Sequence, residues 1–183
     1  MAIGTYMAIE HIAIIGAGQM GNGIAQVSSC AGYKVTMIDI KQEFVDKGML
    51  TIEQSLTKLV SKEKISEDEA QSALSRISIS TDNSSASDAD LVIEAIPEVL
   101  SYKTDLFKEL DSFCKPETIP ATNTSSISID SIASATGRPD RVIGMHFMNP
   151  VPIMRLVELS LIHISEPTRP ERIAYAGFGL KKK

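Results

Sequence analysis

The chain has 183 residues, about one domain's length and enough to bury a hydrophobic core. Its net charge of −5 and aromatic content of 5% argue against nucleic acid as a partner, because such partners need basic surfaces and stacking side chains. The two cysteines and three histidines lack metal-ligand spacing, so we expect no metal site. No apolar run reaches the ~18 residues of a membrane span, and no signal peptide is evident. We therefore expect no membrane partner and a cytoplasmic location.

Short apolar runs alternate with helical patterns from the start of the chain. His11–Ile15 is rich in β-branched residues and ends at a glycine, which is typical of a buried parallel strand. Gln19–Ala31 carries apolar residues at helical spacing, and Lys34–Ile38 is a second strand-like run. Together these segments have the length of a right-handed parallel crossover.

The same alternation continues along the chain. Further strands are predicted at Ile77–Ser80, Leu91–Ala95, Ile119–Thr122 and Val142–Met145. Further helices are predicted at residues 42–60, 62–76, 101–113 and 128–135, with a polar loop at 81–90. Ser66 and Glu69 have capping-box spacing. This pattern predicts an α/β fold with a doubly wound parallel sheet of the Rossmann type, incomplete at its C-terminal end.

From Leu159 onward the sequence departs from this pattern. The segment LSLIHISEPTR resembles the direct translation of a common transposase sequencing adaptor, and the three final lysines fit an A-rich stretch. Such segments are excluded from fold reasoning. We therefore expect residues 1–158 to form the domain and residues 159–183 to be a non-native tail.

The segment GAGQMG, residues 16–21, fits the pattern GxGxxG between a predicted strand and a predicted helix. Gly16 permits a tight turn, Gly18 lets the backbone approach a pyrophosphate, and Gly21 lets the helix pack against the strand. The helix N-terminus offers free N–H groups to phosphates. The motif therefore predicts a dinucleotide site at Gly16, Gly18, Gln19, Met20 and Gly21.

Asp39 ends the second predicted strand, about 20 residues after the glycine motif. A carboxylate there can accept hydrogen bonds from the adenosine ribose and repels a 2′-phosphate, so NAD is favoured over NADP. The alternative for these residues is a plain strand-to-helix turn followed by a surface acid.

Two further segments carry a family resemblance. NTSS, residues 123–126, follows a predicted strand, and HFMNPVP, residues 146–152, follows another and runs on to MRLVE. With GAGQMGNGIAQ and LVIEAIPE, these segments closely resemble the 3-hydroxyacyl-CoA dehydrogenase family, from about His11 to Glu158. The resemblance implies the N-terminal NAD-binding domain of an enzyme that interconverts (S)-3-hydroxyacyl-CoA and 3-oxoacyl-CoA, with a short-chain acyl-CoA as substrate.

The resemblance also implies roles for particular residues. His146 resembles the catalytic base that takes the proton of the 3-hydroxyl group, and Glu158 resembles the carboxylate that orients it. Ser125 resembles the serine that hydrogen-bonds the substrate oxygen. The resemblance further implies that the nicotinamide-ribose end of the cofactor is lined by Glu98, Lys103, Ser125 and Asn149.

Some features of the family are missing from the sequence. The family has a helical C-terminal domain and a further catalytic asparagine, and we expect the complete enzyme to be a homodimer through that domain. We therefore expect this fragment to have little or no activity alone. The alternatives are a fragment of a multifunctional fatty-acid oxidation enzyme, a non-catalytic NAD-binding protein on the same fold, and another β-hydroxyacid dehydrogenase. Taken alone, without the family resemblance, His146 could be a structural histidine and Ser125 a helix cap.

Overall fold

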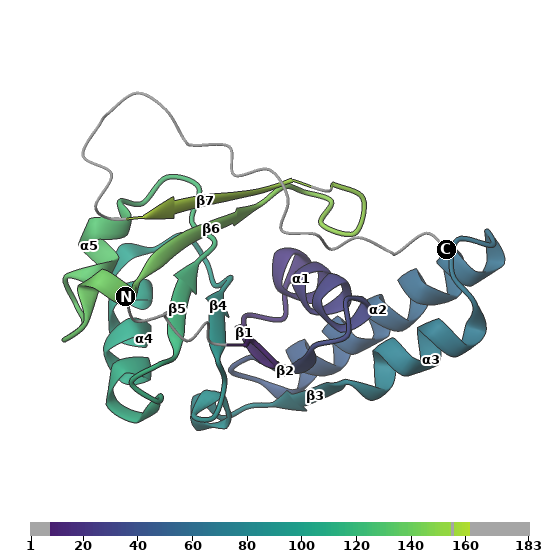
Figure 1. The fold of residues 1–183 in the computed structure, drawn as a ribbon, viewed down its shortest axis with the longest axis horizontal. Coiled ribbons are helices and arrows are strands. Elements are labelled where there is room, and N and C mark those ends of the chain that lie inside the picture. The colour runs from purple at the N-terminus through teal and green to yellow at the C-terminus, as the bar shows by residue number, and fades with distance from the viewer. Residues whose placement is uncertain (1–7, 155, 162–183) are drawn as a thin grey trace, which may run out of the picture.

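The structure is a computed structural model that describes residues 8–154 and 156–161. A seven-stranded sheet runs through the described part of the chain, with helices on both faces (Figure 1). The strands are β1 (His11–Ile15), β2 (Lys34–Ile38), β3 (Ile77–Ser80), β4 (Leu91–Glu94), β5 (Ile119–Thr122), β6 (Ile143–Phe147) and β7 (Val157–Leu161). The helices are α1 (Gln19–Cys30), α2 (Gln42–Ser61), α3 (Glu67–Ser75), α4 (Leu100–Phe113) and α5 (Ile129–Ala133), with 3₁₀ turns at Asn83–Ala86 and Pro139–Arg141.

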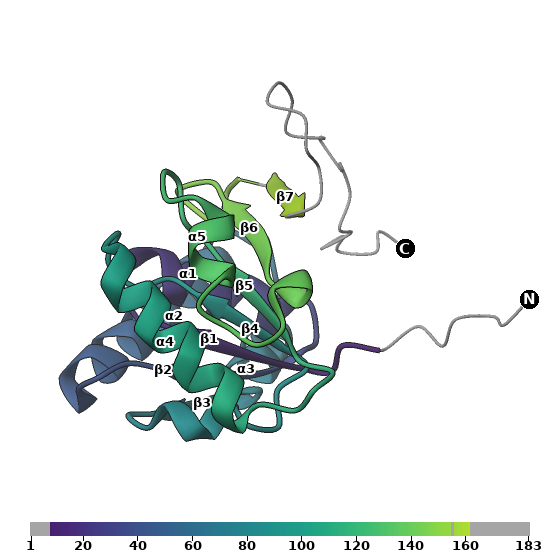
Figure 2. The ribbon, with the colours of Figure 1, turned by 90° about the vertical axis from the view of Figure 1, so that its left-hand side faces the viewer.

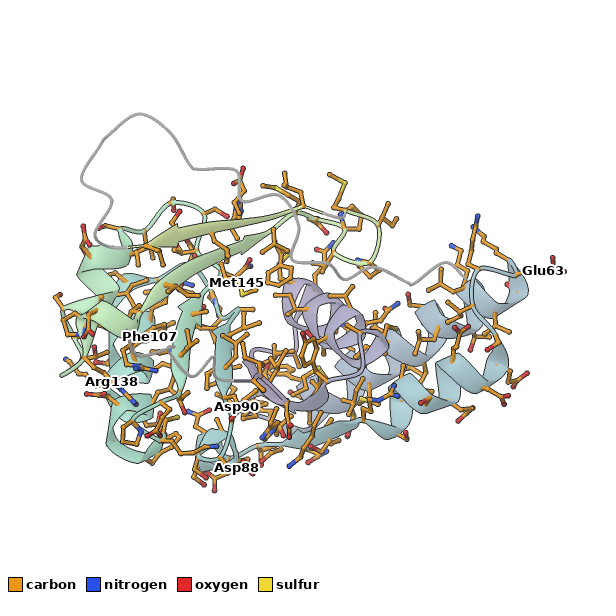
Figure 3. The ribbon with its side chains drawn as sticks, viewed as in Figure 1. Glu63, Asp88, Asp90, Phe107, Arg138 and Met145 are labelled. Carbon is orange, nitrogen blue, oxygen red and sulfur yellow. The ribbon has the colours of Figure 1, made fainter. Side chains whose placement is uncertain are left out.

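The sheet is covered on two faces by two groups of helices. Helices α1, α2 and α3 lie on one face, and α4 and α5 lie on the other, nearest the viewer in Figure 2. Successive side chains of β1 point to opposite faces, so Ile12 and Ile14 pack with the first group while Ala13 and Ile15 pack with α4. Phe107 is buried between α4 and α5 (Figure 3). Burial on both faces explains why the strands read as continuous apolar runs.

The strand order β3-β2-β1-β4-β5-β6-β7 reverses direction between β1 and β4. Strands β1 to β6 pair in parallel, so their carboxyl ends lie at one edge of the sheet. Ligands of open α/β sheets bind outside this edge, at the point of reversal. The predicted doubly wound fold is therefore confirmed, and it places the glycine-rich turn after β1 at the expected binding edge.

Pro120 lies inside β5, between two neighbouring strands, although proline cannot donate a ladder hydrogen bond. The backbone amides of Ile119 and Asn123 donate to Asp90, directly before β4, and to Glu94 of β4, so the alternate position 120 faces β6. Pairing with β6 begins only at Ala121, which is opposite Ile143. The missing donor therefore lies where no partner is required.

The end of the sheet differs from the expectation. Strand β6 runs to Phe147 rather than Met145, so His146 lies inside the strand and not after it. Strand β7 pairs with β6 in antiparallel, so the sheet is not parallel throughout. Strand β7 also crosses the predicted domain boundary between Glu158 and Leu159. Residues 162–183 of the predicted tail lie outside the described residues.

The third predicted helix was placed too early. It was expected over residues 62–76, but α3 begins at Glu67. The predicted capping box is confirmed, because the Ser66 hydroxyl accepts from the Glu69 amide at 3.2 Å and the Glu69 carboxylate accepts from the Ser66 amide at 2.7 Å. Capping groups of this kind fix where a helix starts.

Candidate active site

The glycine-rich turn joins β1 to α1. Gly16 has a φ of +106°, a conformation that favours glycine, and a Cβ there would lie 2.5 Å from the carbonyl oxygen of Ala95. A Cβ on Gly21 would lie 1.6 Å from the carbonyl oxygen of Gly16. Both glycines are therefore required by close packing of the turn, as the motif predicts.

Gly18 differs from the other two glycines of the motif. A Cβ there would meet no protein atom within 4 Å. Gly18 is the N-cap of α1, and no side chain caps this helix end. The first N–H groups of an α-helix have no partner within the helix, and they carry a partial positive charge. The turn therefore has the form of an anion site that a phosphate can approach closely.

Asp39 follows β2, beside the turn. Its carboxylate accepts hydrogen bonds from the amides of Ala17 and Ile40, both at 2.7 Å. Each carboxylate oxygen has a second lone pair, so further hydrogen bonds from a ribose remain available. Asp39 thus holds the glycine-rich turn, a role that the sequence did not reveal.

A pocket of about 1050 Å³ opens at this edge of the sheet. The predicted cofactor residues that line it are Gly16, Gly18, Gln19, Met20 and Asp39. Its wall also includes Ile40, Phe44 and Tyr102, three exposed apolar or aromatic side chains that sequence reasoning missed. Such side chains suit a flat aromatic ring, and their exposure became visible only in the structure.

The three predicted catalytic residues lie together. Ser125 Oγ is 3.1 Å from His146 Nε2, and His146 Nδ1 is 3.4 Å from Glu158 Oε2. Their side chains come from the turn after β5, from β6 and from β7. A hydroxyl, an imidazole and a carboxylate in this order can move a proton at the hydroxyl end while the carboxylate fixes the imidazole tautomer.

The backbone around this cluster is held by Asn123. Its side-chain oxygen accepts a hydrogen bond from the Phe147 amide at 2.8 Å, directly beside His146. The backbone amide of Asn123 donates to the backbone carbonyl oxygen of Glu94 at 2.9 Å. The sequence reading used Asn123 only as part of a motif, and its role became visible only when β5 and β6 were placed side by side.

Glu98 organises the turn that carries Ser125. One carboxylate oxygen accepts from the amides of Ser125 and Ser126, at 3.0 and 3.1 Å, and from the hydroxyls of Thr124 and Ser126. Partial burial raises the pKa of Glu98, but hydrogen bonds from Thr124 and Ser126 and the nearby Lys103 ammonium outweigh this and lower the pKa to about 2. Glu98 is therefore a carboxylate at any physiological pH.

Lys103 was predicted to line the nicotinamide-ribose end of the cofactor. Its side chain is 1% exposed, and its ammonium lies 2.6 Å from Glu94 and 3.1 Å from Glu98. The ammonium therefore lies beneath the site, and direct contact with a cofactor stays a prediction. Sequence reasoning also missed Glu94, although a carboxylate within an apolar strand is itself a signal.

Asn149 connects the catalytic cluster to the glycine-rich turn. Its side-chain oxygen accepts a hydrogen bond from the Gln19 amide nitrogen at 3.3 Å. The loop that holds Asn149 also packs on α1, where a Cβ on Gly23 would lie 2.9 Å from the Cβ of Val151. Figure 1 shows this loop between β6 and β7 reaching over α1. The predicted cofactor and catalytic residues therefore lie at one continuous edge of the molecule.

A Rossmann-type sheet, a glycine-rich turn with an acid after β2, and an adjoining histidine define a dinucleotide-binding protein of the dehydrogenase class. Comparison with known families makes this specific. Residues 11–176 match the family described as "3-hydroxyacyl-CoA dehydrogenase, NAD binding domain", and the chain belongs to this family. The predicted cofactor, NAD, is thereby confirmed for the domain. The match also continues beyond the boundary predicted at residue 158.

Similar proteins agree with this assignment. The chain is 50% identical over 153 residues to a probable 3-hydroxybutyryl-CoA dehydrogenase of Bacillus subtilis, and the match covers 84% of this chain and 53% of that protein. It is 54% identical over 146 residues to a probable 3-hydroxybutyryl-CoA dehydrogenase of Deinococcus radiodurans, and this match covers 80% of this chain and 52% of that protein. The crystal structure of (S)-3-hydroxybutyryl-CoA dehydrogenase from Ralstonia eutropha is 47% identical, with a TM-score of 0.81 and coverage of 83% and 54%.

The chain thus spans about half the length of the curated relatives that it matches. Of the helices in the described residues, none is long and apolar enough to cross a membrane.

Proposed function

We propose that the protein is an NAD-dependent dehydrogenase that interconverts (S)-3-hydroxyacyl-CoA and 3-oxoacyl-CoA, with a short-chain substrate such as 3-hydroxybutyryl-CoA. The observation that carries this proposal is the line formed by Ser125, His146 and Glu158 next to the glycine-rich turn. The names of the relatives support the choice of substrate.

The turn after β1 fits the cofactor. The open space at Gly18 and the uncapped start of α1 suit a pyrophosphate, and Asp39 suits the adenosine ribose. Glu98 and Asn149 are the proposed contacts toward the nicotinamide end, as the family resemblance implies. When bound, NAD supplies the acceptor for a hydride.

His146 performs the proton transfer in this proposal. Its Nε2 faces the position of the substrate hydroxyl, with Ser125 as a second hydrogen-bonding group for the same oxygen. The proton of the 3-hydroxyl passes to Nε2 as the hydride leaves C3 and the carbonyl forms. The Glu158 carboxylate keeps Nδ1 protonated and stabilises the imidazolium. In the reverse direction the imidazolium returns the proton.

The proposal extends to the remainder of the enzyme. Because the relatives are about twice as long, we propose that the region outside this match completes the acyl-CoA cleft and the interface of a homodimer. On that basis the 183-residue chain by itself binds NAD weakly at best and has little or no turnover.

The test is a hydride-transfer assay with 3-hydroxybutyryl-CoA and NAD, made on the complete protein and on its variant His146→Gln. We expect a loss of about a thousandfold in kcat, within the range for removal of a general base, while NAD affinity measured by calorimetry stays the same. Unchanged turnover in the variant would refute catalysis by His146. Binding of NAD without any turnover in the complete protein would instead favour a non-catalytic NAD-binding protein.

A further inference from the structure

Two buried charged residues beneath the active site have no part in the mechanism proposed above. Glu94 ends β4 with a side chain that is 0% exposed, and Lys103 lies in α4 with a side chain that is 1% exposed. Burying two charges is costly, and an apolar pair of the same size is often at least as stable. Stability alone is therefore a weak reason for a glutamate and a lysine at these positions.

Both buried charges have several hydrogen-bond or ion-pair partners. Glu94 accepts from Lys103 at 2.6 Å, from the Thr122 hydroxyl at 2.6 Å and from the Ile96 amide at 2.8 Å. Lys103 has three protons, and besides Glu94 its nitrogen lies 3.4 Å from the Ile96 carbonyl oxygen and 3.1 Å from Glu98. Lys103 therefore connects a carboxylate fixed in the core to a carboxylate at the active-site edge.

Glu98 passes this constraint to the turn 124–126. Lys103 lies beside Oε2 of Glu98, and Oε1 accepts hydrogen bonds from the amides of Ser125 and Ser126, so the position of the carboxylate sets the position of the turn. The same turn carries the Ser125 hydroxyl, which lies 3.1 Å from His146 Nε2. A chain of contacts thus leads from the core, through Lys103 and Glu98, to the catalytic cluster.

We propose that Glu94 and Lys103 are positioning residues, which fix Glu98 and through it hold Ser125 within hydrogen-bond distance of His146. In this role Lys103 acts through Glu98. The inference rests on the proposed function for the roles of Ser125 and His146, and it goes beyond that function in assigning a role to the buried pair.

The test uses a charge-balanced double variant, Glu94→Gln with Lys103→Met. Removing both charges avoids a buried charge without a partner, which would destabilise the fold. The matched control is Asp111→Asn with Arg138→Met, which removes another ion pair of α4, at 2.7 Å. Arg138 is labelled in Figure 3, and the hydrogen bonds of this control pair go to Gly137 and Lys115 instead of Glu98.

The readout is hydrogen exchange of the Ser125 and Ser126 amides, followed by NMR without cofactor or substrate. We expect exchange about tenfold faster in the double variant, because Glu98 has lost the charged partner that fixes it, and unchanged exchange in the control. A third variant, Glu98→Gln, leaves the buried pair in place and should accelerate the same two amides. It provides the comparison should the double variant fail to fold.

The outcomes separate this inference from the proposed function. Unchanged exchange in the double variant, or in Glu98→Gln, would overturn the inference, because the turn would then be held without this chain of contacts. Equal acceleration in the control would also overturn it, since any loss of stability would produce the effect. Turnover lost on His146→Gln, measured separately, concerns the proposed function alone. In the double variant we expect kcat to fall, and the factor of this fall to be larger than the factor by which the KM for NAD changes.

Discussion

His146 and Glu158 are directly opposite one another in the antiparallel ladder of β6 and β7. Directly opposite residues share a face of the sheet, with Cβ atoms about 4.5–5.5 Å apart, so the strand register itself brings the carboxylate to the imidazole. A slip of one residue would turn Glu158 to the other face. The loop between the strands is pinned by Val151 on α1 and by Asn149 on Gln19, which supports this register.

The pairing predicts the effect of Glu158→Gln. The amide keeps the shape of the side chain but cannot stabilise a positive charge on His146. We expect kcat with 3-hydroxybutyryl-CoA to fall about a hundredfold, at the low end for loss of general-base function, while NAD affinity is unchanged. Steady-state kinetics of the complete protein measure this. Ser160→Ala, on the same strand, is the control and should leave kcat unaltered. An equal loss in both variants would mean that β7 matters only structurally.

The glycines of the turn provide a matched pair of substitutions. In Gly21→Ala the new Cβ would lie 1.6 Å from the Gly16 carbonyl oxygen, so the helix must move away from the strand. We expect a loss of about 3 kcal/mol in the free energy of unfolding, as for severe overpacking. In Gly18→Ala the Cβ meets no protein atom, and φ is an ordinary −63°. Stability should change by less than about 0.5 kcal/mol.

The affinity for NAD should separate the effect of Gly18→Ala on cofactor binding from its effect on stability. Gly18→Ala places a methyl group where the pyrophosphate is proposed to approach, and we expect NAD affinity to fall about tenfold or more although the fold is intact. Denaturant titration and calorimetry on each variant give the two quantities. Wild-type NAD affinity in Gly18→Ala would contradict the proposed position of the phosphates.

Asp39 joins the shape of the turn to the choice of cofactor. In Asp39→Asn only one side-chain oxygen remains, so the amide of either Ala17 or Ile40 loses its acceptor. We expect a loss of about 1–2 kcal/mol in unfolding free energy, typical of an unsatisfied donor. We also expect a smaller preference for NAD over NADP, because the repulsion of a 2′-phosphate is gone. Dissociation constants for both cofactors measure the preference, with Asp46→Asn on the exposed face of α2 as the control.

The first strand, helix and second strand could be predicted with correct boundaries to within a residue, because their signals are local. An apolar run, a glycine turn and a helical period lie next to one another in the sequence, and the glycines Gly16 and Gly21 meet steric demands that the motif already implies. The cluster of Ser125, His146 and Glu158 was predicted from the family resemblance. Its geometry depends on β5, β6 and β7 lying side by side.

The parts that sequence reasoning missed are non-local. Strand β7 was not expected because its first residues ended the family resemblance and its last ones looked like a tail, whereas its pairing with β6 follows from the loop that joins them. The side-chain partners of Glu94 are Lys103 and Thr122, which come 9 and 28 positions later. No spacing rule connects such residues, and only the packing of α4 over β4 and β5 makes them neighbours.

The lowered pKa of Glu98 predicts how stability depends on pH. Its pKa falls from 4.5 to about 2 in the folded protein, so the folded state holds the carboxylate more strongly than the unfolded state does. The resulting stabilisation is complete above pH 4.5 and is lost as the pH falls from 4.5 through about 2. In Glu98→Gln this contribution is absent at every pH.

The test is to measure the unfolding free energies of both proteins at about pH 7, 4.5 and 3. We expect the two values to differ most at neutral pH and to converge in acid. Other carboxylates with a lowered pKa, such as Asp90, titrate in both proteins and cancel in the difference. A difference that stays constant down to pH 3 would mean that ionisation of Glu98 does not contribute to the stability of the folded protein.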